Sequence, residues 1–331
     1  MRAAQVIARS EVVLLDVEEP TIGPREVLVK PLFVAICGSD LFHLHFFPEE
    51  EYPQPVGSSG HEMVGVVIKT GAEVSGIKKG DKVLGLVIAH TAMQELCALD
   101  RNLVLKLPPG RTMEEFLMAQ QLGTVIYSTS RLPNMVGKTA VVVGQGSAGL
   151  FFTRLLKRMG MRKVITMDLE QARVDASREY GADAAFVNRG VDPAALVCEL
   201  TNGAMADLVV EVAGEVDTIN LVARLVRQRG QLVFFGIPHE QEFLFDYWSF
   251  FRSYASSYSF SGAMQPTDNA VFEMALSLIA SGEVSVRNMI THRYPLEDVA
   301  GAYSRARHRD DGAVKVIVEM PGSEAFRDRI L

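Results

Sequence analysis

The chain has 331 residues, of which 48% are hydrophobic and 22% are charged, as in ordinary soluble globular proteins. This length exceeds what one hydrophobic core normally serves, so we expect two domains. The formal net charge of −7 argues against a nucleic-acid partner, which needs a basic surface. Three cysteines cannot form a disulfide framework, and no apolar run is long enough for a signal peptide or a membrane span. We therefore expect a cytoplasmic protein that is not bound to a membrane.

The first 110 residues are typical of a β-rich domain. Apolar alternation and β-branched runs bounded by glycine predict strands at 26–37, 63–71 and 82–89, and a strand–turn–strand unit over 71–83. A helical apolar period then covers 112–132, where Thr112 and Glu115 have the spacing of a capping box.

From residue 139 onward, apolar strands alternate with helices. This rhythm predicts a parallel sheet covered on both faces. It continues to about residue 262, and the tail beyond it supplies two further helices and one strand that need not join the same sheet. The expected strands lie at 139–146, 163–168, 184–187, 206–214 and 231–237, and the expected helices include 148–160, 170–182 and 218–230.

A glycine-rich turn connects the first of these strands to the first helix. Gly144, Gly146 and Gly149 have the G-x-G-x-x-G spacing, which allows a tight turn, close approach of a pyrophosphate and close packing of helix on strand. Asp168 follows Gly149 by nineteen residues, at the end of the next strand. An acid there accepts hydrogen bonds from the ribose of NAD and repels the 2′-phosphate of NADP, so the pattern favours NAD. The alternative is a turn that serves packing only, with Asp168 as a helix N-cap.

A second candidate site contains Cys37, and His61 with Glu62 follows twenty-four residues later. Thiolate, imidazole and carboxylate are all zinc ligands. Adjacent histidine and glutamate side chains do not share one face of a strand, but a bend at Gly60 would let them converge. By spacing alone the signal is weak, because a free cysteine is more often a small buried thiol.

Several motifs together make the chain similar to a known family over nearly its whole length. It resembles the zinc-dependent medium-chain alcohol and polyol dehydrogenases. The resemblance implies an α/β protein, with a GroES-like β-rich catalytic domain at 1–121, a Rossmann domain with a doubly wound parallel sheet at 122–262, and a C-terminal return to the catalytic domain at 263–331. The motifs are CGSD at 37–40, GHEMVGVV at 60–67, GDKV at 80–83, NLVLKLP at 102–108, VVVGQGSAGL at 141–150, EYGAD at 179–183, VVEVAG at 209–214 and GQLVFFG at 230–236, and the PLEDVAGAY and GAVKVIV segments of the tail.

The resemblance also implies roles for individual residues. Cys37, His61 and Glu62 would bind one catalytic zinc ion, Ser39 would hydrogen-bond the substrate alcohol and pass on its proton, and Asp40 would orient the zinc histidine. NAD would bind a set of residues around the glycine turn and the neighbouring loops: Thr124, Gly144, Gly146, Ser147, Ala148, Gly149, Asp168, Arg173, Ala213 and Gly236.

Three departures from the family pattern qualify this interpretation. The lobe that holds a structural zinc in many members is absent, since only 18 residues separate Val83 from Asn102 and they contain one cysteine, Cys97. We expect no structural zinc, and we expect Cys97 and Cys198 to be buried thiols. The position of the third ligand of many relatives falls on Gln120, so either Cys37, His61, Glu62 and a water hold zinc, or the site is weakened or empty.

The third departure concerns the proton relay. Phe42 stands where many relatives have the relay histidine. His43 is one residue away, which in extended chain turns a side chain to the opposite face, so His43 and His45 are expected to be surface or loop residues. Candidate walls of the substrate pocket, equally explicable as core residues, are Phe46, Phe47, Val87 and Trp248.

The predicted function is hydride transfer between NAD and an alcohol, which would be a secondary alcohol, a polyol or an amino alcohol such as threonine. The alternatives are a zinc-free medium-chain quinone or enone reductase and a non-catalytic NAD-binding protein of the same fold. The family also suggests a homo-oligomer, dimer or tetramer, joined at the edge of the Rossmann sheet, for which the stretch 242–248 is the expected edge strand.

Overall fold

A computed structural model describes residues 1–260, 269–309 and 311–331 of the chain. The chain separates into two compact units, Met1–Thr124 with Met264–Leu331, and Val125–Ala263. The expected domain boundary between residues 262 and 263 lies outside the described residues. We call these the first unit and the second unit.

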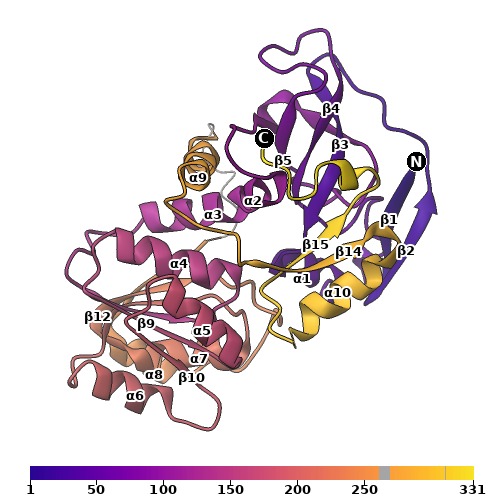
Figure 1. Cartoon of the computed structure of the whole chain (residues 1–331). Coiled ribbons are helices and arrows are strands. Elements are labelled where there is room, and N and C mark those ends of the chain that lie inside the picture. Colours follow the sequence, from indigo (N-terminus) through magenta and orange to yellow (C-terminus); the bar gives the residue numbers. More distant parts are fainter. Residues whose placement is uncertain (261–268, 310) are drawn as a thin grey trace. The chain divides into compact units, whose positions relative to one another are not determined.

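The first unit is built on antiparallel strand pairs, except that β14 runs parallel to β15 (Figure 1). One sheet pairs only β1 with β2, and the larger sheet has the order β14-β15-β3-β4-β5-β7, with β6 paired to β3. Its strands are β1 (Arg2–Ala8), β2 (Glu11–Asp16), β3 (Glu26–Ala35), β4 (Glu62–Thr70), β5 (Lys82–Leu86), β6 (Cys97–Asp100), β7 (Val104–Lys106), β14 (Ile290–Pro295) and β15 (Lys315–Glu319).

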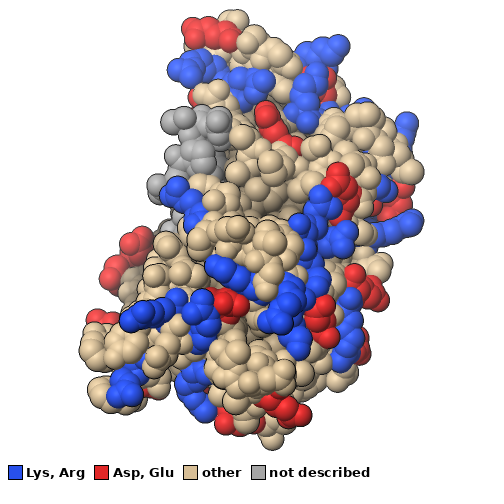
Figure 2. All heavy atoms as spheres, turned by 90° about the vertical axis from the view of Figure 1, so that its left-hand side faces the viewer, with Lys and Arg blue, Asp and Glu red and all other residues tan. Residues whose placement is uncertain are grey.

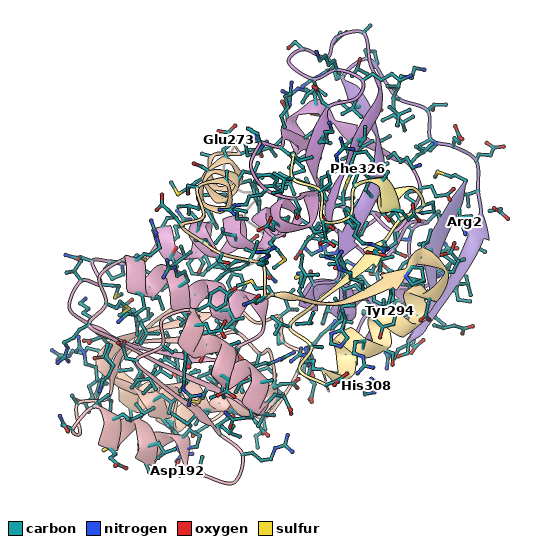
Figure 3. The ribbon with its side chains drawn as sticks, in the orientation of Figure 1. Arg2, Asp192, Glu273, Tyr294, His308 and Phe326 are labelled. Atoms are coloured by element: carbon teal, nitrogen blue, oxygen red, sulfur yellow. The ribbon has the colours of Figure 1, made fainter. Side chains whose placement is uncertain are left out.

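The C-terminal segment completes this sheet. β15 runs antiparallel to β3, with Ile317 opposite Ala35, and β14 pairs with β15 on the other side. Tyr294 on β14 and His308 at the end of the helix α10 are labelled in Figure 3. The helices of this unit are α1 (Gly38–His45), α2 (Met113–Leu117), α9 (Ala270–Ala280) and α10 (Val299–His308), with α3 (Ala119–Ser130) crossing the division between units.

The second unit contains one parallel sheet, with the order β10-β9-β8-β11-β12-β13 among the described residues. Helices α4 and α5 cover one face and α6, α7 and α8 the other (Figure 1), as the alternating pattern predicted. The elements are β8 (Thr139–Val143), α4 (Ser147–Arg158), β9 (Lys163–Asp168), α5 (Gln171–Glu179), β10 (Ala184–Val187), α6 (Pro193–Leu200), β11 (Ala206–Glu211), α7 (Val216–Leu225), β12 (Val226–Phe234), α8 (Tyr247–Ser253) and β13 (Ser256–Ser259).

Local predictions held where the sequence pattern was regular. The capping box at the start of α2 is present: Thr112 accepts from the Glu115 amide and Glu115 accepts from the Thr112 amide. The apolar run that begins at residue 139 predicted a buried strand, and every residue of β8 is buried.

Three local predictions were wrong and one strand was missed. The stretch 71–81 contains turns in place of a strand, and 226–230 belongs to β12 in place of a helix, with Val226 paired to Ala206 of β11. The stretch 242–248 holds no strand, since α8 begins at Tyr247; β13 forms the sheet edge instead. The strand β14 was not predicted at all.

The surface carries mixed charge on the face drawn in Figure 2, where basic and acidic side chains are interspersed. The described residues include no helix with the length and apolar character needed to cross a bilayer.

Candidate functional site

The candidate metal ligands come from the paired ends of two strands. β3 ends at Ala35, which lies opposite Glu62 at the start of the antiparallel strand β4. The chain just beyond β3 carries Cys37, and the chain just before β4 carries His61. One ligand atom from each of Cys37, His61 and Glu62 lies within 4.8 Å of the others. The bend before β4 thus allows neighbouring His61 and Glu62 to face one point.

Asp40 is a completely buried carboxylate at the centre of a hydrogen-bond network. It lies in the first turn of α1, where its Oδ2 accepts from the Cys37 amide at 2.9 Å. Its Oδ1 lies 2.9 Å from His61 Nδ1 and 2.7 Å from His90 Nδ1, and accepts from Ser59 Oγ at 3.3 Å. A carboxylate bonded to Nδ1 fixes the ring orientation and leaves Nε2 for a metal, which is the role predicted for Asp40.

Charge and hydrogen bonding keep this carboxylate ionised. Burial alone would raise the pKa of Asp40, but the charges of and hydrogen bonds from His61 and His90 hold it well below its usual value. Burial likewise opposes protonation of His61, yet Asp40 and Cys37 raise the pKa of that imidazole well above its usual value.

His90 is a site residue that the sequence did not single out. It has a left-handed backbone conformation, with φ of 56°, in the loop after β5. Its ring stacks on that of His43, with 4.3 Å between centroids, and lies tilted against His61 at 4.4 Å. Only the tertiary fold brings this loop to Asp40, and no local motif marks it.

The expectation for His43 and His45 was wrong in its premise. Both residues lie on the helix α1 and not in extended chain, so alternation of faces does not apply. His43 stacks between His90 and Phe47, and burial, followed by the charge of His90, lowers the pKa of His43 to about 4. His45 instead hydrogen-bonds Ser10 through Nδ1 at 2.7 Å.

Glu62 and Lys315 form a fully buried ion pair beside the cysteine. Lys315 Nζ lies 2.7 Å from Glu62 Oε2, and both side chains are 1% exposed or less. Burial disfavours the charge, but Glu62 and then Cys37 raise the pKa of Lys315. Glu62 Oε1 accepts no hydrogen bond from any residue that the structure describes, and it lies 4.0 Å from His61 Nε2.

The amide beside the cysteine belongs to Gln121 and not to Gln120. Gln121 is 7% exposed, and its Nε2 donates to Cys37 Sγ at 3.7 Å. The Gln120 carbonyl accepts from Thr124 Oγ1 at 3.2 Å, which is an ordinary contact within a helix.

The donor set fits zinc. Sulfur, imidazole nitrogen and carboxylate oxygen are the ligand types that zinc takes, and the buried Glu62 Oε1 has an unfilled acceptor facing its neighbours. Ser39 occupies the first turn of α1 and is half-buried, two residues after Cys37.

The glycine turn lies between β8 and α4, as predicted. Gly144 has a φ of +96°, and a Cβ on Gly149 would lie 2.0 Å from the Gly144 carbonyl oxygen. A Cβ on Gly146 would meet nothing within 4 Å. Gly146 is also the N-cap of α4 and supplies no side-chain cap, so the first amides of the helix, including those of Ser147 and Ala148, remain available to an anion.

Asp168 closes the next strand and braces this turn. Its Oδ2 accepts from the Gln145 amide at 2.6 Å, and its Oδ1 accepts from the Glu170 amide at 3.0 Å. Arg173 is 6% exposed and its guanidinium lies 4.0 Å from Asp168. The N-cap of α5 is Glu170 and not Asp168, so the alternative role of Asp168 as a helix N-cap is wrong. Each oxygen of the Asp168 carboxylate retains a lone pair for a ribose hydroxyl.

Parallel register brings the other cofactor candidates of the second unit to the same sheet edge. Glu211 lies opposite Val143 and opposite Phe234, so the loops after β8, β11 and β12 begin at one level. Glu211 Oε1 accepts from the amide of Ala213 at 2.8 Å, and a Cβ on Gly236 would lie 2.4 Å from the Gly214 nitrogen. Thr124 belongs to the first unit.

The remaining candidates are dispersed. Val87 is a core residue at 3% exposure, whereas Trp248 is 67% exposed on α8.

Cys97 is buried, which raises the pKa of its thiol to about 12, as expected for an inert thiol. Cys198, predicted to be buried, is exposed, because it lies on the outer face of α6. Phe46 and Phe47 are half-buried and pack with Phe42.

Two family models match the chain. One is described as the alcohol dehydrogenase GroES-like domain and covers residues 23–121, and the other is described as a zinc-binding dehydrogenase and covers residues 148–281. The first range contains Cys37, His61 and Glu62, and the second contains Gly149 and Asp168.

Individual proteins align over nearly the whole chain. An alcohol dehydrogenase of Cupriavidus necator is 25% identical, with 96% of this chain and 98% of that protein covered. A sorbitol dehydrogenase of Halalkalibacterium halodurans is 27% identical, with 91% and 93% covered. The crystal structure of 2R,3R-butanediol dehydrogenase from Bacillus subtilis superposes with a TM-score of 0.81 at 23% identity, covering 96% of this chain and 99% of that one, which shows the same fold.

Proposed function

Since the chain belongs to the zinc-type medium-chain dehydrogenase family, we propose that it is a zinc-dependent oxidoreductase that transfers hydride between an alcohol and NAD. The observation that carries the proposal is the convergence of Cys37, His61 and Glu62 within 4.8 Å, backed by a buried carboxylate on His61. Three protein ligands leave the fourth coordination position of a zinc ion open for substrate. A carboxylate bonded to the ligating histidine fixes the orientation of its ring.

The residues of the first unit have different proposed roles at the metal centre. Cys37, His61 and Glu62 would hold zinc, which when bound polarises the oxygen of an alcohol as a Lewis acid. Asp40 holds the His61 ring by its Nδ1 at 2.9 Å. Lys315, 2.7 Å from Glu62, offsets one of the two ligand charges. Ser39 is proposed to hydrogen-bond the substrate hydroxyl and to carry its proton outward.

The second unit would bind the dinucleotide by its backbone. The pyrophosphate would lie over Gly146, where no side chain intrudes, against the free amides at the start of α4. Asp168 would accept the ribose hydroxyls and repel a 2′-phosphate, which selects NAD. Arg173, Ala213 and Gly236 complete the proposed set in this unit, and Thr124 is the proposed contribution of the first.

The proposed substrates are secondary alcohols and polyols, with amino alcohols such as threonine as further members of the class. Relatives that align over nearly the whole chain are named alcohol dehydrogenase and sorbitol dehydrogenase. A metal ion contacts only the hydroxyl group that reacts. Specificity for the rest of the substrate therefore depends on the residues that line the pocket.

The test combines metal analysis with a substrate panel. We expect the purified protein to bind about one equivalent of zinc and to reduce NAD faster than NADP with a panel of secondary alcohols and polyols. A zinc content below about half an equivalent that added zinc does not raise would refute the zinc mechanism. Reduction of quinones or enones without metal would then indicate the zinc-free reductase, and the absence of any turnover a non-catalytic NAD-binding protein.

We also propose self-association through the edge strand β13. No described strand pairs on its outer side, and its four residues are all exposed. The neighbouring Tyr247, Trp248 and Phe251 of α8 are 63%, 67% and 51% exposed, an apolar cluster suited to a second copy. Light scattering should show a dimer or tetramer, and Ser257→Pro, which removes one edge amide, should lower the assembly state.

A further inference from the structure

The amide of Gln121 lies beside the cysteine of the proposed metal centre. It projects from α3, is 7% exposed, and places Nε2 3.7 Å from Cys37 Sγ. A thiolate only accepts hydrogen bonds, so the nitrogen of the amide, and not its oxygen, must face the sulfur. An N–H donor stabilises the ionised form of the thiol, which is the form that binds metal.

The other half of the same amide has no partner. Gln121 Oε1 is buried and accepts no hydrogen bond from any of the described residues. A buried acceptor is unfavourable unless a donor reaches it. Because the nitrogen is held at Cys37, the oxygen, on the same planar group, lies within a few ångströms of the proposed ligands and is ready for a hydroxyl donor.

The neutrality of this side chain also fits the charges around it. Two of the three proposed ligands, Cys37 and Glu62, are anionic, and Lys315 supplies one buried positive charge at 2.7 Å from Glu62. A carboxylate in place of the amide would face the thiolate as a like charge. A neutral amide contributes hydrogen bonds to the centre without adding such repulsion.

We propose that Gln121 is a positioning residue of the metal centre, whose N–H donates to the Cys37 thiolate and whose oxygen accepts a hydrogen bond from a hydroxyl that enters the site. The inference rests on the proposed function, because that hydroxyl belongs either to the substrate alcohol or to a water. It differs from ligation, since the amide acts on the ligand and on the hydroxyl and not on the metal.

The experiment compares Gln121→Met with Gln228→Met, the same substitution at an exposed position of β12. Zinc affinity is measured by competition with a chelator, and the thiolate-to-metal charge-transfer band is recorded with cobalt in place of zinc. Without its N–H donor the thiolate gives up electrons more easily, so Gln121→Met should move the band to longer wavelength. It should also weaken zinc binding by about tenfold, as loss of an outer hydrogen-bond partner typically does.

The control Gln228→Met should match the unsubstituted protein in both measurements. Equal zinc affinity and an unmoved cobalt band in Gln121→Met would overturn the proposal. If Gln121→Met does not fold, as judged by its melting temperature, Gln121→Leu provides the second variant and should move the band in the same direction. Steady-state kinetics then identify the hydroxyl: a raised KM with unchanged kcat points to the alcohol, and an unchanged KM to water.

Failure of this inference and failure of the proposed function have different signatures. An unsubstituted protein that binds neither zinc nor cobalt refutes the metal centre itself. A protein that binds both metals, with Gln121→Met indistinguishable from Gln228→Met, leaves the metal centre intact and refutes only the role of Gln121.

Discussion

The proposed dinucleotide site is centred on the backbone of one continuous stretch, whereas the proposed metal site is made of side chains from distant parts of the chain. The junction between β8 and α4 depends on three glycines that lack a side chain: Gly144, Gly146 and Gly149. Around the proposed ligands, by contrast, Lys315 from the C-terminal segment meets Glu62 from the N-terminal part of the chain. The two sites should therefore respond differently to substitution: the first to added atoms, and the second to removed charges.

The largest expected effect is on the side-chain site. Cys37→Ala removes the thiolate ligand, and we expect loss of zinc and a fall in kcat of about a thousandfold, since a Lewis acid contributes several kcal/mol to the barrier. NAD affinity, measured by calorimetry, should stay within about twofold, because the backbone site is untouched. A variant that keeps a tenth of the activity would contradict the assigned role of Cys37.

Breaking the buried ion pair tests the charge of the same site. Lys315→Met leaves Glu62 unpaired at full burial, which should lower the free energy of unfolding by about 3–5 kcal/mol in the metal-free protein. The loss should shrink when zinc is added, because the metal replaces the missing positive charge. Denaturant titrations with and without zinc measure the two free energies of unfolding. The control is Lys69→Met, which removes an exposed lysine from β4, the strand that carries Glu62. An equal loss in the two conditions would show that Glu62 does not meet the metal.

The backbone site can be tested by adding one methyl group at two positions. Gly149→Ala places a Cβ 2.0 Å from the Gly144 carbonyl, so it should lower the free energy of unfolding by about 1–3 kcal/mol. Gly146→Ala has open space, so its melting temperature should stay unchanged while NAD affinity falls, because the methyl group occupies the place of the pyrophosphate. If Gly146→Ala binds NAD normally, the phosphates do not lie there.

One side chain of the second unit should set cofactor choice. Asp168→Ala removes the carboxylate that would repel a 2′-phosphate, and we expect the ratio of kcat/KM for NAD to that for NADP to fall by about tenfold or more. Since Asp168 also accepts the Gln145 amide, a melting curve must accompany the kinetics. A ratio that does not change would mean that Asp168 serves only the turn.

The smallest effect expected concerns the two other cysteines. With a pKa of about 12 and a buried side chain, Cys97 should resist a thiol-alkylating reagent at pH 8 in the native protein. Exposed Cys198 should be modified without loss of activity, and mass spectrometry of the peptides distinguishes the two. Rapid modification of Cys97 would contradict its burial.

The sequence by itself determined the features that depend on local patterns. The alternation of apolar strands and helices predicted the parallel sheet of the second unit, and the glycine spacing predicted the β8–α4 turn. The CGSD and GHE motifs identified Cys37, Asp40, His61 and Glu62, which the structure brings together. Each of these signals is carried by residues close in sequence, so backbone geometry translates it directly into structure.

Only the tertiary structure decided the surroundings of those residues. His90 and Lys315 reach the ligands from a loop and from a returning strand, and neither belongs to a motif that encodes its partner. Gln121 places its amide beside Cys37, a contact between residues 84 positions apart that no local motif encodes. The conformations of α1 and of 226–230 were misjudged for the same reason: short segments with ambiguous periodicity adopt the form that their neighbours in the fold stabilise.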